Sequence, residues 1–241
     1  LEEHGAPEKG IISEVTEAQL IGSETSYITV DIGKLFSSYA TTISHIFNNE
    51  IYYYNESEFE RIDSQIQSYK YSGIKVFLRI VLSAPEDPYI ASVLLYPSTP
   101  PDITQYYAPN TSDEACVKLL SAFCDMIAQR YSTDNTDENG IISGLIIGNE
   151  INRAYENFYA GGKSLNEFAV CCSDMLRIVY NNTVSVNPSL KIYMSFGDVW
   201  YSDIGADSVS GFGTRQLIDS IAAYINLGGD IDWNPSITLA K

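Results

Sequence analysis

The sequence contains few positive charges, and this scarcity excludes two classes of partner. Lysine and arginine together number 14, against 31 aspartates and glutamates, which gives a formal net charge of −17 at pH 7. The cationic residues form no basic stripe, so neither nucleic acid nor an anionic membrane surface is an expected partner. The chain also has no apolar run long enough to cross a bilayer, and membrane insertion is not expected.

Cysteine is also sparse, and its spacing fits neither a disulfide framework nor a metal site. Cys116 and Cys124 lie in one predicted helix, about 12 Å apart along its axis, which is too far for a disulfide. Cys171 and Cys172 are neighbours that face different directions. Because no Cys-x-x-Cys or Cys–His spacing suggests metal ligands, we expect four buried thiols and no cofactor.

The rest of the composition is that of a folded domain rich in tyrosine. Of the 241 residues, 45% are hydrophobic and 19% charged, which is typical of globular proteins. A chain of this length can form one large core, and we expect a single domain over residues 1–241. Tyrosine occurs 18 times, against 9 phenylalanines and 2 tryptophans. Tyrosine suits surfaces that bind sugar or peptide, although many of these side chains are expected in the core.

Hydrophobic periodicity predicts strands and helices in alternation. The predicted strands are 10–13, 27–33, 74–82, 141–148, 190–196 and 231–234, and the predicted helices are 16–21, 59–72, 116–131, 164–180 and 217–227. This order predicts a parallel sheet with crossover helices. A hairpin is predicted over 43–54, around Asn48-Asn49, and Ser164 with Glu167 predicts a capping box.

The connections of this sheet differ in length with their direction. Those from strand to helix are long, and those from helix to strand are short. Barrel enzymes build their sites from strand-to-helix loops, at the carboxyl ends of the strands. We expect one mouth at that face, formed by Asp31, Arg79, Asn149, Glu150, Asp198, Trp200, Trp233 and Asn234.

Glu150 is the central candidate of this group, because an apolar run ends abruptly at Asn149-Glu150. One alternative is that Asn149 or Asn152 only caps a following helix, whose positive end favours Glu150. The convergence of the other strand ends favours a functional role instead. Arg79 is expected either as a solvated edge residue or as an inward guanidinium paired with a carboxylate.

In this predicted fold, Gly148-Asn149-Glu150 at the end of the fourth predicted strand resembles the clan-A glycoside hydrolases. These are (β/α)8 barrels, retaining glycosidases, whose fourth strand ends in Asn-Glu. The resemblance implies that Glu150 is the general acid/base and that Asn149 binds the sugar 2-hydroxyl. More closely, the chain resembles an uncharacterised bacterial family of barrel proteins related to that clan, in segments 146–152, 51–55 and 229–234.

The resemblance also implies a nucleophile that the sequence does not supply. Retaining hydrolysis needs a second carboxyl group about 5 Å from the acid, and in clan A it is a Glu at the end of strand seven. This sequence stops at Lys241, after the sixth predicted strand. We therefore expect an incomplete α/β barrel of the TIM (β/α)8 type, with about six of eight strands. A missing segment or a partner would complete it.

The chemistry assigns expected roles to the remaining candidates. An acid that keeps its proton near neutral pH needs surroundings that are partly apolar or crowded by another carboxylate. Trp200 and Trp233 are expected either to stack on sugar or to plug the barrel mouth. The other candidate substrate contacts are Asp31, Arg79, Asn152, Asp198 and Asn234.

Three functions therefore remain open at the level of sequence. The first is a retaining glycoside hydrolase that acts on an extracellular polysaccharide or oligosaccharide. The second is a non-catalytic carbohydrate-binding barrel, and the third is a different hydrolase that uses Glu150 and Asp198. The family likeness and the acidic charge suggest a bacterial protein that is secreted or displayed at the cell surface. Because Leu1 is not an initiator methionine, we expect that an upstream part has been removed.

Overall fold

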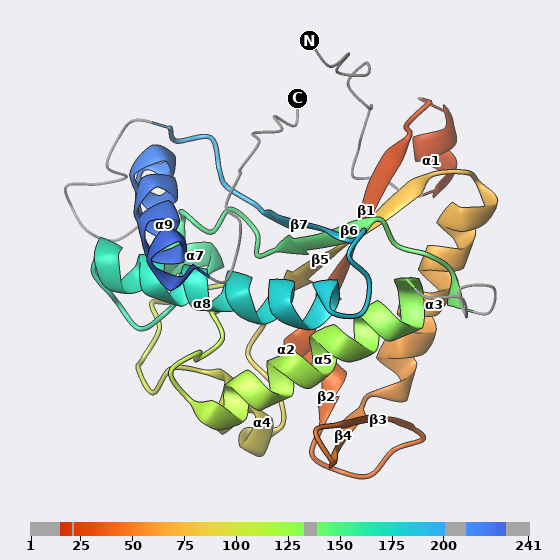
Figure 1. Cartoon of the computed structure of the whole chain (residues 1–241), viewed down its shortest axis with the longest axis horizontal. Coiled ribbons are helices and arrows are strands. Elements are labelled where there is room, and N and C mark those ends of the chain that lie inside the picture. The colour runs from red at the N-terminus through yellow and green to blue at the C-terminus, as the bar shows by residue number, and fades with distance from the viewer. Residues whose placement is uncertain (1–14, 21, 133–138, 201–210, 230–241) are drawn as a thin grey trace.

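The computed structural model describes residues 15–20, 22–132, 139–200 and 211–229 (Figure 1). Its centre is a parallel sheet with the strand order β1-β5-β6-β7. The strands are β1 (Thr25–Asp31), β5 (Lys75–Val81), β6 (Gly144–Ile147) and β7 (Lys191–Met194). Consecutive parallel strands lie side by side, which is the pattern predicted from the alternation of strands and helices. The strands predicted at 10–13 and 231–234 lie outside the described residues.

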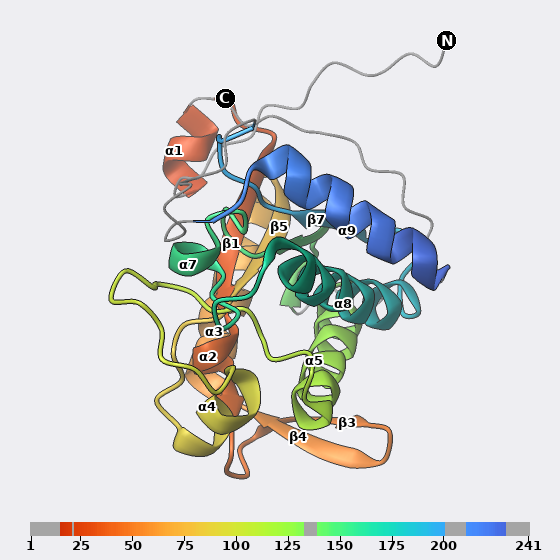
Figure 2. The same cartoon turned by 90° about the vertical axis from the view of Figure 1, so that its left-hand side faces the viewer.

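Among the described residues, eight helices lie before, between and after the strands. They are α1 (Val15–Leu20), α2 (Ile32–Leu35), α3 (Glu56–Tyr71), α4 (Pro88–Leu94), α5 (Glu114–Ser132), α7 (Ala154–Asn157), α8 (Leu165–Val184) and α9 (Thr214–Gly228). Helix α5 packs against α8, and α8 packs against α9, so that these three long helices lie along one side of the sheet (Figure 2). Between helices and sheet lies the core, in which Leu78, Leu145 and Phe123 are almost fully buried.

The other face of the sheet has a different character. Along β1, residues alternate between buried and half-buried, because successive side chains point to opposite faces of a strand. The half-buried set includes Tyr27, Thr29 and Asp31, and Phe77 and Arg79 share their face on β5. In a barrel this face is the interior, and here it carries polar and aromatic groups that lead to the carboxyl ends of the strands.

A second, antiparallel sheet confirms the predicted hairpin and adds one strand to it. Strands β2 (Phe36–Ser37), β3 (Ile43–Phe47) and β4 (Glu50–Tyr54) lie in the order β2-β4-β3. Asn48 and Asn49 have φ angles of 50° and 65°, which is the backbone of a two-residue type I′ turn. The hairpin packs on α5 and lies at the lower edge of the molecule in Figure 1.

The structure differs from the sequence-based prediction mainly in short elements. Of the predicted strand 141–148, only Gly144–Ile147 forms β6. Position 144 requires glycine, because a Cβ there would lie 2.1 Å from the carbonyl oxygen of Lys191 on the neighbouring strand. The loop after β5 contains α4, and the four-residue helices α2 and α7 were not predicted, because one turn of helix has no periodicity to detect. The capping box of Ser164 and Glu167 is confirmed.

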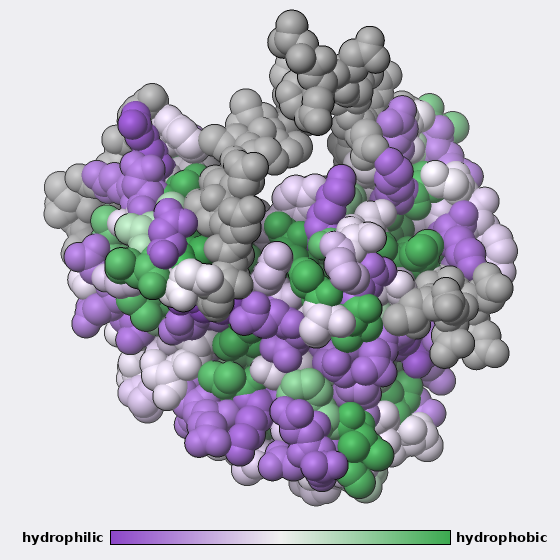
Figure 3. Space-filling view, in the orientation of Figure 1, coloured by the Kyte–Doolittle hydropathy of each residue, from purple (hydrophilic) through white to green (hydrophobic). Residues whose placement is uncertain are grey.

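Two further expectations concern the cysteines and the membrane. All four cysteines are free and buried, as their spacing predicted. Among the helices that the structure describes, none is long and apolar enough to span a bilayer. On the face shown in Figure 3, hydrophobic residues occur in small groups among hydrophilic ones.

Candidate functional site

The turn after β6 has an unusual backbone that is fixed from both sides. Gly148 has a φ of +71° and Glu150 a φ of +47°, and few non-glycine residues adopt such angles. The amide of Gly148 donates to the carbonyl oxygen of Ile80, 2.8 Å away in β5. The amide of Glu150 donates to Ser195 Oγ at 3.2 Å, just after β7. Because strained residues persist where their surroundings enforce them, often at functional sites, this turn is the first candidate.

The Glu150 carboxylate is accessible and lies among polar groups. Glu150 Oε2 is 3.3 Å from Arg153 Nε, and the Glu150 side chain is 40% exposed. Asn157 Nδ2 donates to the same oxygen at 3.4 Å. Among the described residues, a guanidinium and an amide are the polar partners of this carboxylate, and neither is the apolar group or second carboxylate that was expected beside it. The carboxylate does lie at the carboxyl end of the sheet and is open to a ligand.

Arg153 joins the ends of two strands by binding several carboxylates. Its Nη2 atom is 3.5 Å from Asp198 Oδ1, which follows β7, and its Nη1 atom is 3.8 Å from Glu156 Oε2. The Asp198 side chain is 85% exposed. Glu150 and Asp198 therefore meet at one cation, as the predicted convergence of strand ends required. Arg153 itself was not predicted, and its only signal in the sequence is the i, i+3 spacing from Glu150.

Arg79 has different partners from those expected. Its Nη1 atom donates to Asn149 Oδ1 at 2.8 Å and to the Tyr27 hydroxyl at 2.9 Å, and its Nη2 atom donates to Thr29 Oγ1 at 2.7 Å. The guanidinium also lies 4.5 Å from the Tyr27 ring centroid. The expected carboxylate partner is wrong for the described part of the chain, where amide and hydroxyl oxygens accept instead. Burial raises the pKa of Tyr27, and the nearby Arg79 partly offsets this effect.

The bond from Arg79 also fixes the orientation of the Asn149 amide. A guanidinium has donors only, so the Asn149 oxygen must face it. The NH2 group of Asn149 is then the end of the amide that can donate to another molecule. Thus Arg79 links β1, β5 and the turn after β6 in one hydrogen-bonded group.

Two sequence candidates have structural roles instead of exposed ones. Asn152 is fully buried, and its Oδ1 accepts a hydrogen bond from the amide of Gly197 at 2.6 Å. A direct contact between Asn152 and substrate is therefore wrong for this structure, in which Asn152 positions the loop after β7. Asp31 Oδ1 accepts from the amides of Gly33 and Ser83, at 3.1 and 2.9 Å, and so caps α2 and ties the ends of β1 and β5 together.

The tryptophan candidates are only partly covered by the structure. Trp200 is half-buried, and its carbonyl oxygen accepts from the amide of Arg215 at 3.4 Å, near the start of α9. Trp233 and Asn234 lie outside the described residues. Among those that are described, no group of three or more His, Cys, Asp or Glu side chains could hold a metal ion.

Comparison with known proteins gives a family and a fold. The family described as "Family of unknown function (DUF5722)" matches residues 2–237, and no curated protein sequence matches the chain. An endo-1,4-beta-mannanase from Rhizomucor miehei superimposes with a TM-score of 0.56 and 14% identity, over 90% of this chain and 66% of that chain. A beta-mannanase from the blue mussel Mytilus edulis gives a TM-score of 0.47 and 10% identity, over 90% of this chain and 65% of that one.

The likeness to the Rhizomucor miehei mannanase confirms the expected fold class. The fold is α/β, with a four-strand parallel sheet and the architecture of a TIM-barrel glycoside hydrolase. The chain spans just under two-thirds of the length of the two mannanases. At this level of identity the likeness establishes the fold alone.

Proposed function

Because the chain belongs to DUF5722, a family of unknown function, we propose its function from its own site: a carbohydrate-active barrel in which Glu150 is the general acid/base of retaining glycoside hydrolysis. The observation that carries this proposal is the position of Glu150. Its carboxylate is accessible, follows a parallel strand of a glycosidase-like barrel, and is held there by a left-handed backbone.

Each described group around Glu150 has a role in this chemistry. Glu150 would donate its proton to the glycosidic oxygen as the bond to the leaving sugar breaks, and would later take a proton from water. The NH2 group of Asn149, oriented by Arg79, would donate to a sugar hydroxyl. Arg153 would hold the Glu150 carboxylate before substrate binds. When Glu150 turns to the substrate, Arg153 can stay paired with Asp198 and Glu156.

The nucleophile is the part of the mechanism that we assign to none of the described residues. Retaining hydrolysis requires a second carboxylate about 5 Å from the first. We propose that a segment or partner that completes the barrel supplies it. The substrate would be a polysaccharide or oligosaccharide outside a bacterial cell, and detection of the protein in the secreted or surface fraction tests this location.

The test of the catalytic role compares Glu150→Gln with Glu156→Gln. Glu156 also faces Arg153 and lies in the same loop, so its substitution controls for a loss of charge there. Release of reducing ends from neutral polysaccharides is measured for the wild type and both variants, in the form whose barrel is completed by the segment or partner that supplies the nucleophile. Glu150→Gln should lower turnover by about 10²- to 10⁴-fold, whereas Glu156→Gln should retain most of it. Equal turnover in the two variants would contradict the assignment.

A second candidate function is carbohydrate binding without catalysis. It is favoured by one observation: within the described residues, the groups that contact the Glu150 carboxylate are Arg153 and Asn157, and neither is a carboxylate. In that case the wild-type chain would bind polysaccharide without releasing reducing ends, and Glu150→Gln would bind equally well.

A further inference from the structure

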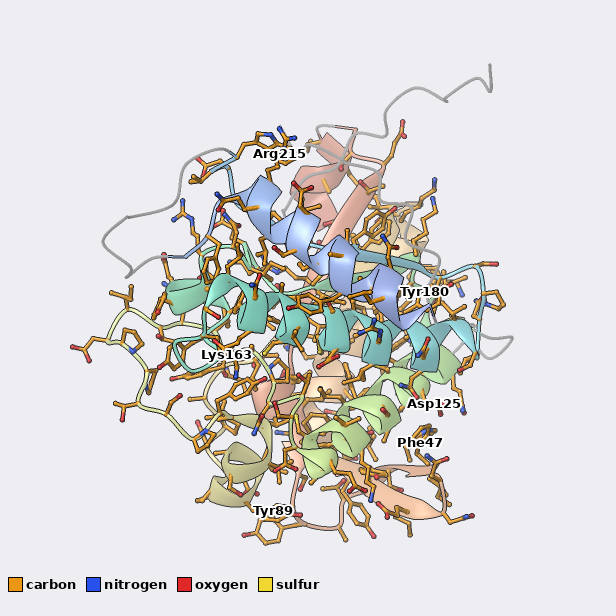
Figure 4. All side chains as sticks on the ribbon, turned by 60° about the vertical axis from the view of Figure 1, so that its left-hand side comes forward. Phe47, Tyr89, Asp125, Lys163, Tyr180 and Arg215 are labelled. Carbon is orange, nitrogen blue, oxygen red and sulfur yellow. The ribbon has the colours of Figure 1, made fainter. Side chains whose placement is uncertain are left out.

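Two of the most exposed aromatic side chains, Tyr39 and Tyr89, lie on loops that leave the same edge of the sheet. Tyr39 is 77% exposed and Tyr89 is 64% exposed. Tyr39 follows β2 in the connection from β1 to α3, and Tyr89 lies in α4, in the connection from β5 to α5. Both connections begin at the carboxyl ends of parallel strands, the edge that also carries Glu150. Figure 4 shows Tyr89 at the periphery of the molecule.

Hydrogen bonds hold the two loops together beneath these rings. Ser38 Oγ donates to the Asp87 carboxylate, which links the residue before Tyr39 to the N-cap of α4. Asp87 Oδ1 also accepts from the amide of Tyr89 at 2.8 Å. Given the spacing of consecutive Cα atoms, the two tyrosine Cα atoms are at most roughly 20 Å apart.

The backbone at each ring is fixed as well. Ser37 Oγ accepts from the amide of Tyr39 at 3.1 Å and donates to its carbonyl oxygen at 3.0 Å. On the other loop, Ser92 Oγ donates to the carbonyl oxygen of Tyr89 at 2.7 Å. The rings are thus presented to solvent from ordered backbone. A ligand that stacks on them has little loop ordering entropy to overcome.

The charge around the two rings restricts the ligand. Segments 36–42 and 86–92 contain no lysine, arginine or histidine and contain two carboxylates, Glu86 and Asp87. An anionic ligand would therefore find no counter-charge within these segments, in a chain whose net charge is −17. A neutral ligand with both apolar faces and hydroxyl groups matches a phenol ring, which has an apolar body and one polar tip.

We propose that Tyr39 and Tyr89 form a second carbohydrate-binding surface, outside the residues that contact Glu150, for a neutral polysaccharide chain. This inference rests on the proposed carbohydrate function and narrows it, because a surface separate from the site selects polymers over short oligosaccharides. A polymer that spans both loops is held at a second position while its backbone enters the mouth.

The test is affinity electrophoresis of the 241-residue chain in gels that contain galactomannan, xylan or hydroxyethylcellulose, with polygalacturonate as the anionic comparison. At least one neutral polymer should retard the wild type. Tyr39→Ala and Tyr89→Ala should each raise the dissociation constant about three- to tenfold. The matched control is Tyr71→Ala, since Tyr71 is 85% exposed but ends α3 at the opposite edge of the sheet. Circular dichroism checks that each variant is folded.

The outcomes separate this inference from the catalytic proposal. The second surface is supported if Glu150→Gln is retarded like the wild type while Tyr39→Ala and Tyr89→Ala lose retardation. This result does not depend on the turnover of Glu150→Gln. The inference is overturned if the tyrosine variants bind like the wild type, if Tyr71→Ala weakens binding equally, if polygalacturonate retards the chain as strongly, or if no neutral polymer does.

Discussion

Glu150 has a left-handed backbone conformation that costs energy for any residue with a Cβ. The conformation is enforced by neighbours on both sides, since the amides of Glu150 and Ile151 both bond to Ser195 and the amide of Gly148 bonds to Ile80. A turn with this geometry would be more stable with glycine. The presence of glutamate at this position is therefore better explained by what its carboxylate does than by the stability of the fold.

The strain at Glu150 predicts opposite orders of stability for two pairs of glycine and alanine variants. Glu150→Gly should be more stable than Glu150→Ala by about 1 kcal/mol, because only glycine adopts the positive φ without strain. At Glu60, which is exposed in the second turn of α3, Glu60→Gly should be less stable than Glu60→Ala by about 1 kcal/mol. Urea unfolding of the four variants measures both differences. The same sign at both positions would show that Glu150 is not strained.

Among the elements, the β3–β4 hairpin makes a polar contact with α5 through His45 and Asp125. His45 Nε2 lies 2.6 Å from Asp125 Oδ2, and both side chains are largely buried. Gln129 Nε2 donates to the same carboxylate oxygen at 2.7 Å, so that Asp125 accepts from two residues. The outer side of the hairpin exposes Ile46 and Ile51, which pair across the strands. The buried side of the hairpin and the contact between His45 and Asp125 therefore set the orientation of the hairpin on α5.

A double-mutant cycle tests the contribution of this contact. Asp125→Asn and His45→Gln should each destabilise the chain, and the double variant should be less destabilised than the sum. We expect a coupling energy of about 1 kcal/mol, the usual size for residues in direct contact. Asp63→Asn combined with His45→Gln is the control, because Asp63 contacts Arg130 and Tyr131 and not the hairpin. A coupling near zero in the first cycle would mean that the apolar contacts alone place the hairpin.

Over the whole molecule, the core includes the four cysteines of α5 and α8. Burial raises the pKa of Cys116 to about 12 and also raises the pKa values of Cys124, Cys171 and Cys172. Since the thiolate is the reactive form, burial lowers both access and reactivity. The helices that carry these thiols, α5 and α8, pack against each other, so the reactivity of the thiols reports whether that packing is intact.

The expected result is that the native chain does not react with a thiol reagent such as DTNB at pH 8. In concentrated guanidinium chloride all four thiols should react without a reductant, because none is in a disulfide. The time course of absorbance under the two conditions measures this. A thiol that reacts within seconds in the native chain would show that the packing of α5 against α8 opens easily.

The sequence by itself determined the local features of this protein. Alternating strands and helices, the Asn48-Asn49 turn, the capping box at Ser164 and the position of Glu150 at a strand end all follow from patterns within short stretches. Such patterns depend on backbone preferences and on burial of one face, both of which a linear sequence displays. The parallel sheet followed from the same patterns, whereas the glycosidase-like fold class followed from the resemblance of Gly148-Asn149-Glu150 to clan A.

Only the tertiary structure decided the partners of the site residues. The bond from Arg79 to Asn149 joins residues 70 positions apart, and Asn152 bonds to Gly197 across 45 positions. Whether a guanidinium meets a carboxylate or an amide, and whether an asparagine is exposed or buried, depends on strand register and loop packing. These are set by the sum of many distant contacts, which no local pattern records.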